Sequence, residues 1–97
     1  MRLLEQQKNA IKQKALKYFG DDVNVYIFGS RMDDTKRGGD IDIYIKAKPL
    51  DNMLDVKIDY LQALEGELGK QKIDVVIDDG KAQKVIYEIA RREGVEL

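Results

Sequence analysis

The segment from Asp40 to Ala47 alternates strictly between apolar and polar residues, and this pattern constrains the fold more than any other feature. The apolar positions are Ile41, Ile43, Ile45 and Ala47, and the polar positions are Asp40, Asp42, Tyr44 and Lys46. A period of two predicts a β-strand with its apolar residues on one face. Pro49 ends the pattern. The chain is therefore expected to contain a sheet that packs on a core.

Other segments predict the elements around this strand. Amphipathic spacing and end signals predict helices over 3–19, from Asp51 to about Gly69, and over roughly 81–93. Runs of β-branched and aromatic residues predict strands over 23–28 and 73–77. A turn and one short helical segment are expected from about Ser30, whereas 95–97 is too short to assign. The order α-β-(short α)-β-α-β-α predicts an α/β (α+β) domain in which helices cover a mixed three- to four-stranded sheet.

Each of the later helices is expected to bury an apolar stripe. In the second helix the stripe comprises Met53, Leu54, Ile58, Leu61, Leu64 and Leu68. In the last helix it comprises Val85, Ile86, Ile89 and Ala90. Tyr60, Leu61 and Tyr87 could contact a partner, but such helix residues more often belong to the core.

Length and composition describe a small globular chain. Its 97 residues predict a single domain over 1–97. The chain has no apolar run long enough to span a bilayer, and its start lacks a signal-peptide pattern, so no membrane association is expected. It has no cysteine, which excludes disulfides and favours a reducing compartment. A cytoplasmic protein is therefore expected.

The residue types available for chemistry are few. The chain has neither histidine nor cysteine, which excludes serine–histidine and cysteine–histidine nucleophile pairs and the usual zinc sites. Any catalysis must use carboxylates, hydroxyls, lysine and arginine, together with an oxygen-liganded cation such as Mg²⁺. The net charge of -1 argues against broad nucleic-acid binding. The lysines of the first helix are interpreted as a solvated face.

Three aspartates are the candidate catalytic and metal-binding residues. Asp40 and Asp42 lie two positions apart on one strand, so their Cα atoms are roughly 6.6 Å apart and their side chains share a face. A divalent cation would relieve their repulsion. Asp74 takes the face of its strand opposite to Ile73 and Val75. It is expected to lie near Asp40 and Asp42 if the two strands are neighbours. Asp40 could instead simply end a glycine loop, and Asp74 could be a charge that protects an edge strand.

Gly29 and Ser30 follow the first predicted strand and form a candidate phosphate-binding turn. Glycine lets a phosphate approach the backbone, and the serine hydroxyl adds a donor. Arg31, Lys36 and Arg37 in the same segment could offset triphosphate charge, although a solvated loop explains them equally well. A Gly-Ser pair alone is weak evidence. Its combination with the Asp40-x-Asp42 pattern is much more specific.

The two motifs resemble the signature of the DNA polymerase β-like nucleotidyltransferase superfamily. They read Phe28-Gly29-Ser30-Arg31 and Gly38-Gly39-Asp40-Ile41-Asp42-Ile43. Within that superfamily the chain is most similar to the minimal nucleotidyltransferase group of small prokaryotic proteins, and the likeness covers nearly the whole chain. The gap between Ser30 and Asp40 is often one residue longer in that group.

The resemblance implies a site and a reaction. Asp40 and Asp42 are expected to hold Mg²⁺ as one or two ions, Asp74 to complete the site, and Gly29 and Ser30, with Arg31, to bind the triphosphate of ATP. It also implies a small helical partner of the HEPN type. Independently, the small size of the chain leaves no separate domain for the acceptor, so such a helical partner or a second copy of the chain is expected to complete the acceptor site. In such toxin–antitoxin pairs the antitoxin transfers AMP from ATP to a tyrosine of the toxin.

Two alternatives stay open at this point. The chain could be a non-catalytic antitoxin that blocks its partner's surface. It could also transfer a nucleotidyl group to a small molecule or to an RNA end, as larger members of the superfamily do. The three aspartates favour catalysis over the first alternative, and the weak net charge and small size disfavour the second.

Overall fold

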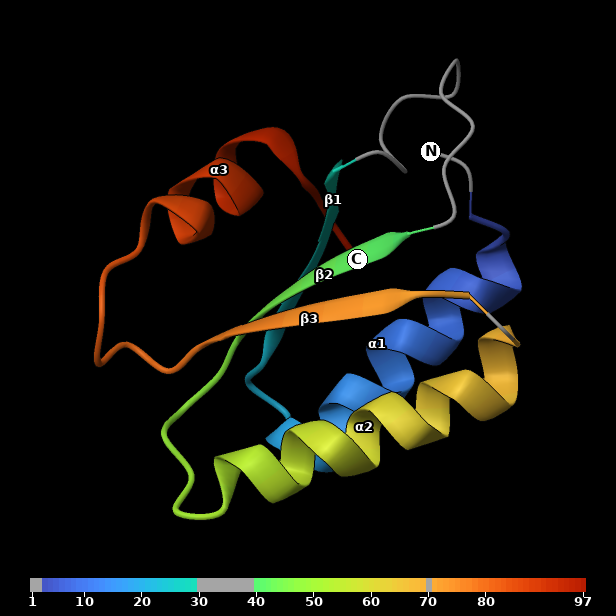
Figure 1. The fold of residues 1–97 in the computed structure, drawn as a ribbon, viewed down its shortest axis with the longest axis horizontal. Helices are drawn as coiled ribbons and strands as arrows, with labels where there is room; N and C mark the ends of the chain where they lie inside the picture. The colour runs from blue at the N-terminus through green and yellow to red at the C-terminus, as the bar shows by residue number, and fades with distance from the viewer. Residues whose placement is uncertain (1–2, 30–39, 70) are drawn as a thin grey trace.

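The computed structural model describes residues 3–29, 40–69 and 71–97 (Figure 1). These residues form three helices and four strands. The elements are α1 (Glu5–Phe19), β1 (Asn24–Phe28), β2 (Ile41–Lys46), α2 (Met53–Leu68), β3 (Ile73–Asp78), α3 (Val85–Glu93) and β4 (Val95–Glu96). The expected α+β architecture is confirmed. The short helix expected from about Ser30 lies outside the described residues.

The strands form one mixed sheet in the order β3-β2-β1-β4. β1 runs antiparallel to both β2 and β4, and β2 runs parallel to β3. Helix α2 makes the crossover between the two parallel strands, as a parallel pair requires. The pairing of β4 with Tyr26 and Ile27 adds the fourth strand. A two-residue strand has no detectable period, so the sequence could not assign it.

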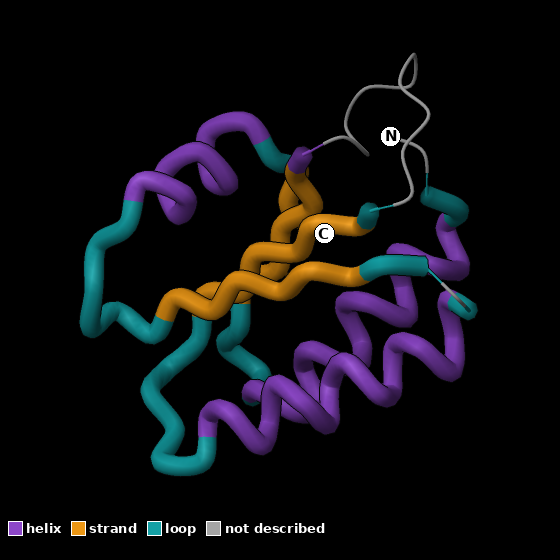
Figure 2. The backbone as a smooth tube through the Cα atoms, in the orientation of Figure 1, coloured by secondary structure: helices purple, strands orange, loops and turns teal. Residues whose placement is uncertain are grey.

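Helices cover both faces of the sheet (Figures 1 and 2). Helices α1 and α2 pack side by side on one face, where Ile41, Ile43 and Ile45 are fully buried. Helix α3 packs on the opposite face, where Phe28, Tyr44, Tyr87 and Ala90 form a second, smaller cluster. The strict alternation of β2 explains both clusters, because successive side chains enter opposite layers.

The expected apolar stripe of α2 is wrong in part. Leu54 and Ile58 are 70% and 45% exposed, whereas Tyr60, Leu64 and Leu68 are buried. Tyr60 turns this face inward because its hydroxyl donates a 2.9 Å hydrogen bond to the Ile11 carbonyl of α1, and its ring packs edge-on against Phe19. Tyr60 therefore belongs to the core and is not a partner contact.

The expected stripe and start of α3 are also wrong in part. The helix begins at Val85, which is 72% exposed, and Ile86 is exposed as well. Ala90 is buried as expected, and Tyr87 faces the sheet beside it, where its ring packs against that of Tyr44 on β2. At the start of α2, Asn52 and not Asp51 occupies the cap position.

Among the described residues, no helix combines the length and apolar character needed to cross a membrane.

Candidate active site

Asp42 and Asp74 lie side by side on neighbouring strands. They are register partners in the parallel β2–β3 pair, and Asp42 is also opposite Phe28 of β1. Residues in register share a face of the sheet, so both carboxylates lie on the face that α3 covers in part. Asp42 is partly buried and Asp74 is exposed. Asp40 lies just before β2, and its Oδ2 is 3.9 Å from the Nζ of Lys72.

Gly29 ends the first strand directly against the side chain of Asp42. Its φ of +81° lies in the left-handed region, which favours glycine. A Cβ atom added there would overlap Oδ2 of Asp42 and would lie 3.0 Å from its Cγ. The candidate phosphate turn therefore begins in contact with a candidate metal ligand. Ser30 and Arg31, the other expected triphosphate contacts, lie outside the described residues, as do Lys36 and Arg37.

The environment of Asp42 disfavours its charge. Burial raises the pKa of this carboxyl, and the nearby charges of Asp74 and Asp40 raise it further, while Lys72 partly opposes them. This combination of burial and repulsion is what a bound divalent cation would relieve. The side chains offer only carboxylate oxygens, which suit a hard cation such as Mg²⁺ better than a soft metal. Within the described part of the chain, however, no three His, Cys, Asp or Glu side chains are gathered closely enough to hold a metal.

The sequence profile described as Polymerase beta, Nucleotidyltransferase matches residues 9–97. The chain belongs to this nucleotidyltransferase family. None of the curated proteins matches its sequence. The three helices and the four-stranded mixed sheet are consistent with the nucleotidyltransferase fold.

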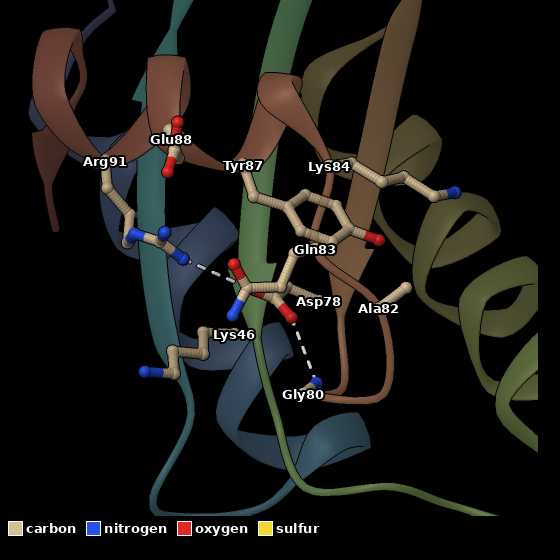
Figure 3. Close-up of a pocket in the computed structure, with 9 residues that line it drawn as sticks. All are labelled: Lys46, Asp78, Gly80, Ala82, Gln83, Lys84, Tyr87, Glu88 and Arg91. Carbon is tan, nitrogen blue, oxygen red and sulfur yellow. Dashed lines mark hydrogen bonds and ion pairs between the residues drawn. The ribbon is translucent and has the colours of Figure 1, made fainter.

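This nucleotidyltransferase also has a buried polar network that sequence reasoning missed. Tyr44 donates a 2.6 Å hydrogen bond to Oδ2 of Asp78, and Nη1 of Arg91 contacts both the Tyr44 hydroxyl (2.8 Å) and the same Asp78 oxygen (3.2 Å). The Gly80 amide donates to Oδ1 of Asp78 (Figure 3). Asp78 is only 5% exposed. Asp78 is the last residue of β3, one position beyond the predicted strand, and it continues the alternation of Asp74 and Val76.

The network holds its acid in the charged form. Burial acts to raise the pKa of Asp78, but the hydrogen bonds from Tyr44 and Gly80 and the charge of Arg91 outweigh it, so the pKa lies below its ordinary value. Burial and the bond to Asp78 raise the pKa of Tyr44 to about 12. Tyr44 therefore stays a neutral donor. Through Arg91 on α3, Tyr44 on β2 and Asp78 on β3, the network connects the helix to the sheet.

A pocket beside this network is separate from the aspartate site. Its lining includes Lys46, Asp78, Lys84 and Arg91 (Figure 3). Lys46 lies at the opposite end of β2 from Asp40, and six residues of strand span roughly 20 Å. The pocket and the aspartates therefore occupy opposite ends of the same sheet face.

Proposed function

We propose that this protein is a minimal nucleotidyltransferase that uses Mg²⁺ to transfer AMP from ATP to a hydroxyl group, with pyrophosphate as the leaving group. The acceptor in this proposal is a tyrosine of a HEPN-type toxin, for which the chain acts as antitoxin. The observation that supports it most strongly is the arrangement of Gly29, Asp42 and Asp74. Gly29 lies so close to the Asp42 carboxylate that no side chain fits there, and the Asp74 carboxylate lies beside Asp42. A phosphate turn and a metal site would share this corner of the sheet.

The residues have distinct roles in the proposed reaction. Asp40, Asp42 and Asp74 would hold one or two Mg²⁺ ions. When bound, the cation would neutralise triphosphate charge and lower the pKa of the acceptor hydroxyl. Gly29 leaves the backbone open to a phosphate, and Ser30 and Arg31 would add a hydroxyl donor and a positive charge. Asp74, the exposed member, is the best placed to accept the acceptor's proton.

The proposed partner follows from the small number of elements in the fold. The described helices and strands build one sheet and its covering layers, so the described residues provide no further unit to bind an acceptor. A second polypeptide, either a helical HEPN-type protein or another copy of this chain, would complete the acceptor site. Most of the rate acceleration would then come from positioning and charge neutralisation.

The test is an incubation with labelled ATP, Mg²⁺ and a candidate HEPN-type protein. We expect the label on the partner, its loss when the partner tyrosine is changed to Phe, and its loss in Asp42→Asn. Asp21→Asn serves as the matched control, because Asp21 lies in an exposed turn outside the site. Label on RNA or on a small molecule would replace the proposed acceptor by the corresponding alternative.

One observation favours a non-catalytic antitoxin as the second candidate. The Lys72 amine approaches Asp40, and no third ligand gathers with Asp42 and Asp74 among the described residues. In that case Lys72 rather than a cation would offset part of the negative charge. Tight binding of the partner with no transfer of label, unchanged by Asp42→Asn, is the result that this second candidate predicts.

A further inference from the structure

Strand β3 forms one edge of the sheet and leaves a row of backbone groups unpaired. The strand order β3-β2-β1-β4 gives β3 a single neighbour, β2. The Ile41 amide of β2 donates a 2.9 Å hydrogen bond to the Lys72 carbonyl. In a parallel pair such bonds recur at every second residue, so the even-numbered residues of β3 bond to β2. The backbone groups of Ile73, Val75 and Ile77 therefore point outward, and we call these three residues the β3 edge row.

Among the described residues, only one hydrogen bond reaches the β3 edge row. The Tyr87 hydroxyl of α3 donates to the Ile77 carbonyl (3.0 Å), which leaves that oxygen a second lone pair. The three amides of the row and the carbonyls of Ile73 and Val75 have no partner in the described part of the chain. In Figure 1 no described helix or strand lies in front of β3. An edge of this kind can pair with a further strand.

The two outer residues of the row also leave apolar surface uncovered. Ile73 and Ile77 pack on the core but stay partly exposed, whereas the isoleucines of the central strand β2 are fully buried. A strand on the free side would supply the missing cover. Residues 73–78 contain neither the proline nor the lysine that often protects an edge strand. The opposite edge differs, because β4 has only two residues.

The residues of β3 fit a second copy of the same strand in one antiparallel register. If Val75 lies opposite Val75 of the second copy, Ile73 lies opposite Ile77, and the whole β3 edge row forms hydrogen-bonded pairs. In that register Asp74 lies opposite the apolar Val76. A shift by two residues in either direction places Asp74 opposite a carboxylate of the second copy, and like charges directly opposite each other are destabilising. Asp74 therefore selects the register.

We propose that two copies of this chain associate through β3 and form one continuous sheet. Val75 lies at the symmetry axis, and the isoleucines of the β3 edge row pair across it. Asp74 and Val76 lie on the face of the sheet that carries Asp42, so the second copy supplies the next strand beside the aspartate site and becomes one wall of it. Backbone hydrogen bonds and apolar pairs hold the two copies together, so the association does not rest on the proposed nucleotidyl transfer.

Amide hydrogen exchange of the ¹⁵N-labelled full chain tests this register residue by residue. Sedimentation equilibrium compares dilute with concentrated protein, and we expect a dimer at the higher concentration. In the dimer the amides of the β3 edge row should exchange about tenfold more slowly or less, whereas those of Asp74 and Val76, already bonded to β2, should change much less. A chain that stays monomeric, or a dimer in which the edge-row amides exchange as fast as in the monomer, would overturn the proposal.

Matched substitutions at Val76 test its pairing with Asp74. Val76→Lys places a cation opposite the Asp74 carboxylate of the second copy, and Val76→Glu places an acid there. Both remove the same apolar side chain, so the dissociation constants of the two variants should differ by about tenfold, with the lysine variant tighter, because the pair occurs twice. The same two changes at Val95, on the opposite edge strand, should give equal constants.

Circular dichroism verifies that each variant is folded, and hydrogen exchange of the unmodified chain does not depend on the variants. Equal dissociation constants for the two Val76 variants, or an equally large difference between the two Val95 variants, would contradict the assignment of the contact to β3.

Discussion

Gly29 lies directly against Asp42, and the aspartate carboxylate leaves no room for a Cβ atom at position 29. The contact joins the end of β1 to the start of β2, and Asp42 in turn lies in register with Asp74 of β3. One corner of the sheet thus combines a left-handed glycine, a carboxylate with a raised pKa and an exposed carboxylate. The first three predictions concern this corner.

Gly29→Ala should destabilise the fold by about 2 kcal/mol. Roughly 1 kcal/mol comes from the positive φ, which alanine adopts poorly, and the remainder from displacement of Asp42. Chemical denaturation measures the change. In an Asp42→Ala background the second contribution should disappear, so a double-mutant cycle should give a coupling of about 1 kcal/mol. Purely additive effects would show that the two residues are not in contact.

Asp42→Asn should stabilise the protein at neutral pH while it abolishes transfer. The folded state raises the pKa of Asp42, so this group supports stability below its ordinary pKa and loses that support as pH rises through the raised value. At pH 7 the ionised carboxylate is therefore unfavourable. Because solvent partly screens it, we expect a gain of up to about 1 kcal/mol, or a few degrees in Tm.

Thermal melts from pH 3.5 to 7.5 in the presence of a chelator provide the measurement. The difference between the wild type and Asp42→Asn should shrink towards low pH, where the wild-type carboxyl is protonated. Asp21→Asn is the control and should show no comparable gain. A Tm of Asp42→Asn below that of the wild type across the whole range would contradict the raised pKa.

Mg²⁺ should raise the Tm of the wild type but not of Asp42→Asn. A ligand at ten times its Kd that binds only the folded state adds about 1.4 kcal/mol to stability. Asp74→Asn should reduce the effect, because it removes the neighbouring carboxylate. Sodium chloride at equal ionic strength is the control for screening. The same Mg²⁺ shift in all three proteins would place the ion elsewhere, and this result would not depend on knowing the acceptor.

Much of the sheet could be predicted because a strand has a short period. Alternation alone places Asp42 on the face of β2 that lies away from its buried isoleucines. The same alternation in β3 places Asp74 on the matching face. Only the neighbouring positions of the two strands had to be assumed. The roles of these carboxylates stay predictions.

The helical faces were harder to predict because α2 carries apolar residues on several sides. Spacing alone could not decide between Ile58 and Tyr60, and a hydrogen bond to Ile11, 49 positions away in the sequence, turned the helix towards Tyr60. The Tyr44–Asp78–Arg91 network was missed for a similar reason. Tyr44 lies 34 positions from Asp78 and 47 positions from Arg91 in the sequence, and no local pattern reports such contacts.

Asp78→Asn should destabilise the protein by about 2 to 4 kcal/mol at pH 7, because it leaves Arg91 and the buried Tyr44 hydroxyl without their charged acceptor. The network lowers the pKa of Asp78, so its contribution is complete above the ordinary pKa and is lost as pH falls through the lowered value. Urea unfolding should therefore show the largest difference from the wild type at pH 5 to 7 and convergence in acid. Asp59→Asn, an exposed acid with no partner among the described residues, should change stability by less than about 0.5 kcal/mol. A difference between the wild type and Asp78→Asn that grows as pH falls would show that Asp78 is held in its neutral form.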